Sequence, residues 1–201
     1  MNRLFRFVGC SLVLLSSCAA REEWNTVMDI KSEYSVDLPG KPENISRTVD
    51  IQGETITVVG KLCVADNGYI SCGVTVSTFP EEMVNDTDAA EFFQSVANRT
   101  AESLPGAVIT QEPETEFQGY PSELFVAKSG KDSQQNSIIC RTVKVGNRVY
   151  SQMLTETAGR KLSAASRERF LNSFKITASA PKTPSDQPSD EKPKSEPAKA
   201  E

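Results

Sequence analysis

Histidine is absent from the 201 residues of this chain. Its absence excludes Ser-His-Asp and Cys-His nucleophile systems, histidine acid–base catalysis and most zinc or iron sites. The formal net charge is −5, whereas a nucleic-acid-binding protein needs clustered Lys and Arg to displace counterions. We therefore expect a protein that is not an enzyme, with no catalytic residue, no metal, no cofactor and no nucleic-acid partner.

Long hydrophobic runs are also lacking, and the apolar run near the start of the chain is short. Two arginines precede the roughly nine residues Phe7 to Leu15, which suit a signal peptide, whereas a membrane-spanning helix needs about 20. The run ends in Leu15-Ser16-Ser17-Cys18. This ending resembles the bacterial lipoprotein signal, in which cleavage between Ser17 and Cys18 follows lipidation of the cysteine thiolate.

The lipoprotein signal implies a lipid anchor on Cys18, where two or three acyl chains hold the protein durably at a membrane of the cell envelope. Ala19 follows the cysteine, and lipoproteins without Asp at that place commonly go to the outer membrane, facing the periplasm, if the cell is Gram-negative. Two alternatives stay open. An ordinary secretory signal cut near Ala20 would remove Cys18, and the apolar run could instead be a buried first helix.

The C-terminal segment 178–201 has proline every three to five residues, mixes Lys with Asp and Glu, and holds no large apolar side chain. Such a segment buries too little apolar surface to offset its ordering entropy, so we expect a disordered tail. We therefore divide the chain into a signal peptide at 1–17, the lipidated cysteine and a tether at 18–32, one domain at 33–177, and the tail.

Within the domain, β-branched residues between turn residues predict strands, and spacing of 3.6 residues predicts helices. Strands are expected at 34–42, within 49–80, and at 107–117, 119–130, 137–145 and 148–157, with helices at 88–104 and from Ser163. This order predicts an α+β fold in which an antiparallel β-sheet is covered by helices, an α/β/α sandwich.

Turn and cap residues predict where some of these elements end. Asp88 is expected to cap the longer helix. A two-residue loop at Gly146-Asn147 would join the last two strands and place Val143 opposite Tyr150, so that one face of the hairpin is apolar.

Three cysteines lie in the domain, and Cys63 and Cys72 form a candidate disulfide. A two-residue loop at Asn67-Gly68 would place these two cysteines opposite each other. A three-residue loop beginning at Asp66 would instead place Leu62 opposite Cys72. The other pairs of that second register are Val64 with Ile70 and Val58 with Val76. We favour the second register because it groups apolar residues, so we expect buried, unbridged cysteines, Cys140 included.

Alternating glutamates in the stretch QEPETEF raise the question of a cation site. Glu112, Glu114 and Glu116 would lie along one side of an extended segment, and hard cations such as calcium prefer clustered oxygens. The stretch lacks the turn that would fold these ligands around an ion. A charged edge strand that discourages aggregation is the better interpretation, and we assign no metal.

Short motifs recur along the domain in a recognisable order: YSVDLPGKP, a strand meander ending in STFP, a long helix, GYPSELF, NRVYSQML and a closing FLNSFKI. This order, over about residues 33–176, resembles the PsbP-like group, which includes the photosystem II protein PsbP and bacterial envelope lipoproteins of the DcrB type. The resemblance implies a sheet between helices and an accessory or binding role. The matching residues, expected at strand ends and in the core, are Pro39, Gly40, Pro42, Pro80, Tyr120, Pro121, Tyr150, Phe170 and Phe174.

Together these features predict a membrane-anchored envelope lipoprotein that serves as a non-enzymatic accessory module and binds an envelope protein. The alternative is a carrier of a small ligand or lipid in the envelope. A carrier predicts an internal pocket between sheet and helix, lined by residues such as Phe92, Phe93 and Phe125. An interaction module predicts a filled core and an exposed patch.

Overall fold

The fold is described from a computed structural model that covers residues 23–51, 53–85, 88–112 and 114–178. The predicted signal peptide, Cys18 and nearly all of the predicted tail lie outside the described residues. Within the described ranges, no helix combines the length and apolar character needed to cross a bilayer.

The larger of two sheets has eight strands, and its paired neighbours are antiparallel. Its strands follow the order β3-β4-β5-β10-β9-β8-β6, and β7 also pairs with β8. The bounds are β3 Glu43–Ile51, β4 Glu54–Ala65, β5 Ile70–Thr78, β6 Val108–Glu112, β7 Glu116–Phe117, β8 Tyr120–Ser129, β9 Asn136–Val145 and β10 Arg148–Glu156. The predicted antiparallel sheet is thus present, and the acidic strand β6 lies at one edge, as expected.

The β9–β10 hairpin has the predicted register. Val143 lies opposite Tyr150, and the loop consists of Gly146 and Asn147. Gly146 has φ +58°, which suits the first position of a type II′ turn, where glycine meets no steric penalty. The local turn residues therefore determine the pairing of the two strands.

The smaller sheet was not predicted. It has the order β1-β2-β11, with β1 Trp24–Asp29, β2 Tyr34–Pro39 and β11 Lys175–Ile176. The range 24–29 had been assigned to the tether, but it pairs with β2 along its whole length, and the Val27 side chain is buried in the main core. The folded domain therefore begins at or before Trp24.

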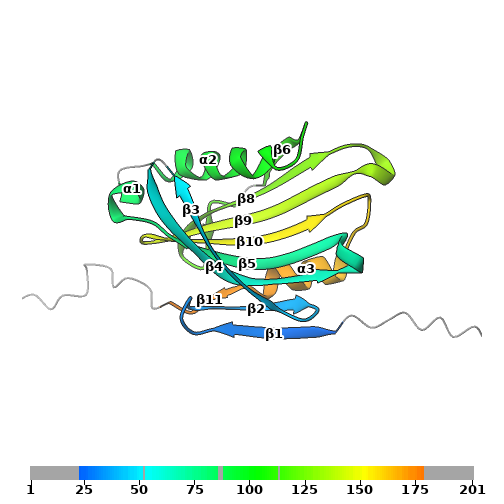
Figure 1. Ribbon diagram of the computed structural model, residues 1–201, viewed down its shortest axis with the longest axis horizontal. Helices are drawn as coiled ribbons and strands as arrows, with labels where there is room; N and C mark the ends of the chain where they lie inside the picture. The colour runs from blue at the N-terminus through cyan, green and yellow to red at the C-terminus, as the bar shows by residue number, and fades with distance from the viewer. Residues whose placement is uncertain (1–22, 52, 86–87, 113, 179–201) are drawn as a thin grey trace, which may run out of the picture.

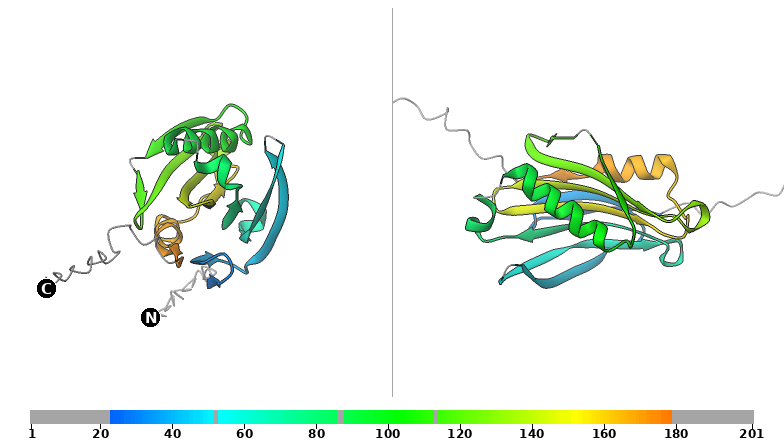
Figure 2. Two further views of the ribbon diagram at one scale, coloured as in Figure 1. Left: turned by 90° about the vertical axis from the view of Figure 1, so that its left-hand side faces the viewer. Right: turned by 90° about the horizontal axis from the view of Figure 1, so that it is seen from above.

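Helices lie on both sides of the larger sheet, as Figures 1 and 2 show. The short α1 (Glu81–Asn85) precedes α2 (Ala89–Glu102), and α2 lies over β6 and β8. On the opposite face, α3 (Ala164–Ser173) lies beside the smaller sheet, against β2. The predicted sandwich is therefore only partly matched, because one face is covered by a helix together with a second sheet. Two 3₁₀ turns, at Asp66–Gly68 and Asp132–Gln134, complete the elements.

Helix ends follow the predicted capping chemistry. Asp88 accepts a hydrogen bond of 2.8 Å from the Ala90 amide, and Ser163 accepts one of 3.0 Å from the Ser166 amide. Each side chain satisfies an amide that has no partner within its helix. The predicted start of both helices is confirmed.

The favoured register of β4 and β5 is wrong. Cys63, not Leu62, lies opposite Cys72. The loop has four residues, 66–69, and the Tyr69 carbonyl at its end accepts hydrogen bonds from the Thr157 amide and hydroxyl at 2.9 and 3.0 Å. A loop of residues 66–69 gives the same strand register as a two-residue loop at Asn67-Gly68, since both place Cys63 opposite Cys72. This register leaves the Val64 side chain 54% exposed. The observed pairing therefore does not follow the local apolar pattern, and its loop is bonded to a residue 88 positions along the chain.

Candidate functional site

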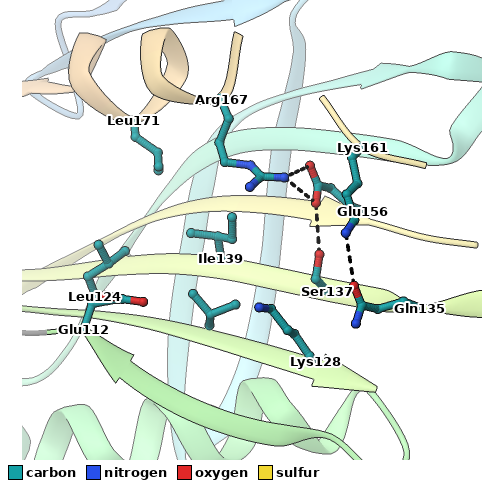
Figure 3. Close-up of a pocket in the computed structure, with 11 residues that line it drawn as sticks. Glu112, Leu124, Lys128, Gln135, Ser137, Ile139, Glu156, Lys161, Arg167 and Leu171 are labelled. Carbon is teal, nitrogen blue, oxygen red and sulfur yellow. Dashed lines mark hydrogen bonds and ion pairs between the residues drawn. The ribbon is translucent and has the colours of Figure 1, made fainter. Parts of the chain in front are cut away.

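A cleft lies between α3 and the sheet face formed by β6, β8, β9 and β10, with a cavity volume of about 320 Å³. We call it the α3 cleft and define it by its lining residues, shown in Figure 3. They are Glu112, Leu124, Val126, Lys128, Gln135, Ser137, Ile139, Glu156, Lys161, Arg167 and Leu171. Its size is at the lower end of the range for ligand sites, about 300–1,000 Å³.

Part of the floor of the α3 cleft is apolar, because alternate residues of neighbouring strands point to the same face. Leu124 and Val126 of β8 and Ile139 of β9 share this face, with Val126 directly opposite Ile139. Leu171 and Arg167 approach from α3, so the helix forms one wall (Figure 3). The cleft therefore offers both apolar and polar surface to one occupant.

A buried carboxylate connects α3 to the sheet at one end of the cleft. The Glu156 side chain is 2% exposed and accepts hydrogen bonds from Ser137 Oγ at 3.1 Å and from the Leu162 amide at 3.0 Å. Arg167 Nη2 donates to both of its carboxylate oxygens, at 2.8 and 3.0 Å. A buried carboxylate is stable only when it is paired in this way. Glu156 therefore positions the N-terminal half of α3.

A second polar group connects the C-terminal end of α3 to the sheet. Arg141 Nη1 donates to the Leu171 carbonyl at 2.8 Å, and Gln152 Nε2 donates to the Phe170 carbonyl at 2.7 Å. These carbonyls belong to the last turn of the helix, where they lack backbone partners within the helix, and Ser173 Oγ of the same helix also donates to the Phe170 carbonyl, at 2.9 Å. Arg141 also pairs with Glu114, its Nε lying 2.9 Å from Oε1. A cation at the C-terminus and a carboxylate near the N-terminus both suit the helix dipole.

Cationic groups in the α3 cleft remain available to an occupant. Lys161 donates to the Gln135 amide oxygen at 3.2 Å, and among the described residues neither Lys161 nor Lys128 forms an ion pair. The buried Nε of Arg167 has no hydrogen-bond partner within the described part of the chain. A buried donor without an acceptor is costly, so this one favours an acceptor supplied from outside. An anionic group fits this end of the cleft.

The three glutamates considered as a cation site are separated by the fold. Glu112 lies at the edge of the α3 cleft and Glu116 in β7, whereas Glu114 is turned inward to Arg141. No group of three or more Cys, Asp or Glu side chains within the described ranges could hold a metal ion. The carboxylate of Glu114 is therefore paired with the Arg141 guanidinium and does not share a cation site with the other two glutamates.

The aromatic residues expected to line a carrier pocket lie on the other face of the sheet. Phe125 is fully buried beneath α2 and packs with Ala97 of that helix. Phe92 and Phe93 are also buried, with ring centroids 5.9 Å apart in an edge-to-face contact. The expected lining of the pocket is thus wrong, since these rings pack into core clusters and the α3 cleft lies on the opposite face.

The residues shared with the PsbP-like motifs take structural positions. Tyr150, Phe170 and Phe174 are buried in the main core together with Tyr120, and Pro39 ends β2. The Phe174 ring lies 6.4 Å from the Tyr150 ring, centroid to centroid. None of these residues lines the α3 cleft.

The cleft itself was missed from the sequence because its lining residues come from segments between 112 and 171 that fold together. Glu112 had been interpreted as part of an acidic edge. The alternation of Leu124, Val126 and Lys128 was a usable signal, since it places two apolar side chains and one cation on one face.

Comparisons with known proteins give little beyond the fold. No protein-family model matches the chain, and no curated protein matches it. Among solved structures, the chain is similar to the solution structure of cyanobacterial PsbP (CyanoP) from Synechocystis sp. PCC 6803. The TM-score is 0.46 at 15% sequence identity, and the match covers 81% of this chain and 98% of that chain.

Proposed function

We propose that this protein is a lipid-anchored envelope module of the PsbP-like type that works without catalysis, by holding a segment of a partner protein in the α3 cleft. The order of the sequence motifs supports the PsbP-like assignment, and the ending at Cys18 supports the anchor. The partner segment is expected to carry Asp or Glu beside apolar side chains.

The observation that supports this function most is the combination of charge and apolar surface in the α3 cleft. The chain has a net charge of −5, yet three cations (Lys128, Lys161 and Arg167) line this cleft against two carboxylates (Glu112 and Glu156). Complementary charge increases the association rate and the specificity of an interface. The apolar part of the floor supplies surface that a partner's side chains can bury.

The arrangement of the polar residues in the α3 cleft supports a binding role better than a catalytic one. The Glu156 carboxylate is fully engaged by Ser137, the Leu162 amide and Arg167, so it holds α3 in place. General acid–base catalysis needs a titratable group within reach of a substrate proton. The buried polar residues are therefore interpreted as supports of the cleft wall.

A small amphiphilic anion is the second candidate occupant. The cleft volume of about 320 Å³ suits a small molecule, and a carboxylate head could accept from Arg167 while its apolar part covers Ile139. This would make the protein a small-ligand carrier in the envelope. Extraction of the purified protein into organic solvent, followed by mass spectrometry, separates the two candidates, since a carrier releases a stoichiometric ligand.

The test of the protein partner is in-cell cross-linking of the C-terminally tagged full chain, with mass spectrometry of the membrane fraction. The double variant Lys128→Glu/Lys161→Glu reverses the charge of the cleft and should reduce the main cross-linked partner about tenfold. The matched control is Lys31→Glu/Lys41→Glu, which reverses two exposed lysines outside the cleft. Equal recovery of the partner with both double variants would contradict the proposed site.

The predicted lipid anchor on Cys18 is tested separately. Metabolic labelling with a palmitate analogue should label the wild-type chain and the Cys10→Ser variant, whereas Cys18→Ser should lose the label and leave the membrane fraction. Persistent label on Cys18→Ser would contradict lipidation at this cysteine. In a Gram-negative host, density-gradient separation of the two membranes then checks the expected outer-membrane position.

A further inference from the structure

Cys63 and Cys72 lie directly opposite each other on β4 and β5, with their sulfur atoms 3.3 Å apart. Residues directly opposite in an antiparallel pair have Cα atoms about 4.5–5.5 Å apart, which lies within the ~4.4–6.8 Å that disulfides span. A disulfide bond is about 2.05 Å long, so the two sulfurs need to approach by roughly 1.3 Å. In the structure the two cysteines are buried and not joined by a disulfide, and the strand register brings their thiols close to bonding geometry.

Both side chains are fully buried in the main core. The turn after β2 covers them, since a Cβ placed on Gly40 would lie 3.8 Å from Cβ of Cys63. On the other side, Leu154 of β10 lies opposite Cys72. Apolar surroundings protect a disulfide from reductants, and they also close the site to oxidants once the fold is complete. Any bond must therefore form before the core closes.

We propose that Cys63 and Cys72 are joined by a disulfide bond in the mature protein, formed as the chain folds with a disulfide oxidant. The Cys63 thiolate attacks the disulfide of the oxidant, whose S–S bond breaks and releases one thiol. Cys72 then attacks the Cys63 sulfur of this mixed disulfide and releases the second thiol. The two protons and two electrons of the cysteines end on the two thiols of the reduced oxidant.

Once β4 and β5 have paired, and before the core closes, the contact between the thiols favours Cys63 as the attacking thiolate. The hydrogen bond with Cys72 lowers the pKa of Cys63, against the opposing effect of burial, and a lower pKa gives a larger thiolate fraction. Cys140 lies on the opposite face of the sheet, in the cluster under α2, and burial raises its pKa to about 12. It is therefore expected to remain a thiol.

The bond would close the β4–β5 hairpin around the loop that holds Tyr69. Closing a loop of about ten residues restricts the unfolded chain, which corresponds to a rise in Tm of about 5–10 °C for a domain of this size. Its presence in cells rests on the proposed envelope address, because the cytosol keeps thiols reduced. Its formation on refolding in vitro does not depend on that address.

The experiment uses the full chain in detergent, reduced and unfolded, then refolded with oxidised glutathione and alkylated under denaturing conditions. Trypsin leaves Cys63 and Cys72 together in peptide 62–99 and Cys140 alone in peptide 132–141. We expect peptide 62–99 without alkyl groups and two hydrogens lighter than its reduced form, while peptide 132–141 is alkylated. The Cys140→Ser variant should give the same result for peptide 62–99.

Two alkyl groups on peptide 62–99 after refolding, a glutathione adduct on it, or a link from it to peptide 132–141 would overturn the proposal. The same digest of protein alkylated directly in the membrane fraction tests the cellular state. Full alkylation there, despite bond formation on refolding, would overturn the bond in the mature protein and count against the oxidising address. Partner binding in the α3 cleft is tested separately and would stand in either case.

Discussion

The two faces of the larger sheet are covered in different ways. Under α2 the contacts are apolar, with Phe125 packed against Ala97 and with Phe92 and Phe93 buried beside them. Under α3 the sheet presents buried polar side chains, among them Gln152, which is fully buried. One helix is therefore held mainly by buried apolar area, and the other also depends on hydrogen bonds made at its two ends.

This difference explains how the α3 face comes to carry a cleft. Phe170 is the fully buried apolar residue that α3 itself contributes, so the helix covers little of the sheet. Polar contacts from Arg141, Gln152 and Glu156 fix its ends and leave the surface beside it open to solvent. Because α3 is bonded mainly at its two ends, the space beside it stays open and the helix forms a wall of the cleft. In contrast, α2 packs apolar side chains against the sheet.

The largest expected loss of stability comes from a substitution on the apolar face under α2. Phe125→Ala removes a fully buried ring and should lower the free energy of unfolding by about 3–5 kcal/mol, because a cavity remains where the ring was. Urea denaturation followed by circular dichroism measures it. The control is Val108→Ala, a residue 71% exposed on β6, which should change stability by less than about 0.5 kcal/mol. Similar losses for both variants would contradict this description of the α2 face.

The next effect tests the polar support of the opposite face. Arg141→Met removes the donor to Glu114, Gln152 and the Leu171 carbonyl and should cost about 2–4 kcal/mol, because buried acceptors lose their partner. Arg169→Met is the matched control, since Arg169 also pairs with a carboxylate but its side chain is 48% exposed. That change should cost less than about 1 kcal/mol. An equal cost in urea denaturation would show that burial of the pair does not matter.

A double-mutant cycle sharpens the comparison at the other end of α3. Glu156→Gln, Arg167→Gln and the double variant should give a coupling energy of about 1–3 kcal/mol, because the carboxylate is buried and the Arg167 side chain is only 33% exposed. Thermal unfolding of the four proteins provides the values. Additive effects of the two single changes would mean that this pair does not hold the helix.

The smallest expected effect is the pH dependence of Asp37, which links β2 to α3. Partial burial opposes ionisation, but hydrogen bonds from Thr26 and Arg169 and the charge of Arg169 prevail and lower its pKa from the ordinary 3.8. The contribution is therefore present above the unfolded-state value and lost as the pH falls through the folded-state pKa.

Asp37→Asn should lower stability by less than about 1 kcal/mol at neutral pH, and the difference from wild type should shrink as the pH falls through the lowered folded-state pKa of Asp37. Thermal melts of the two proteins across this range provide the check. A difference that persists at the acidic end would assign the effect to packing instead of charge.

Much of the fold was predictable where short segments determine it. The β9–β10 hairpin follows from Gly146-Asn147 and an alternating pattern, and both helix starts follow from a capping side chain. These signals depend on residues close in sequence, so no tertiary information was needed.

The sequence predictions were wrong where contacts between residues far apart in the chain determine the structure. The loop between β4 and β5 is bonded to Thr157 through the Tyr69 carbonyl, and two-residue β11 joins β2 from the far end of the domain. The local β1–β2 pair was missed because 24–29 was assigned to the tether. The α3 cleft was likewise hidden, because Lys128 and Arg167 meet only after α3 is placed by buried polar groups that the sequence pattern does not pair.

The most direct test of the cleft as the partner site is photo-cross-linking in cells, with a photoreactive phenylalanine analogue placed singly on each face of the full chain. Position 135 lies at the edge of the α3 cleft, and a change there keeps Lys128, Lys161 and Arg167 but removes the Gln135 acceptor of Lys161. Position 98 lies on the exposed side of α2. We predict one discrete adduct from position 135, whose cross-linked peptide carries Asp or Glu beside apolar residues, and none from position 98. The same adduct from position 98, or no protein adduct from position 135, would contradict the account.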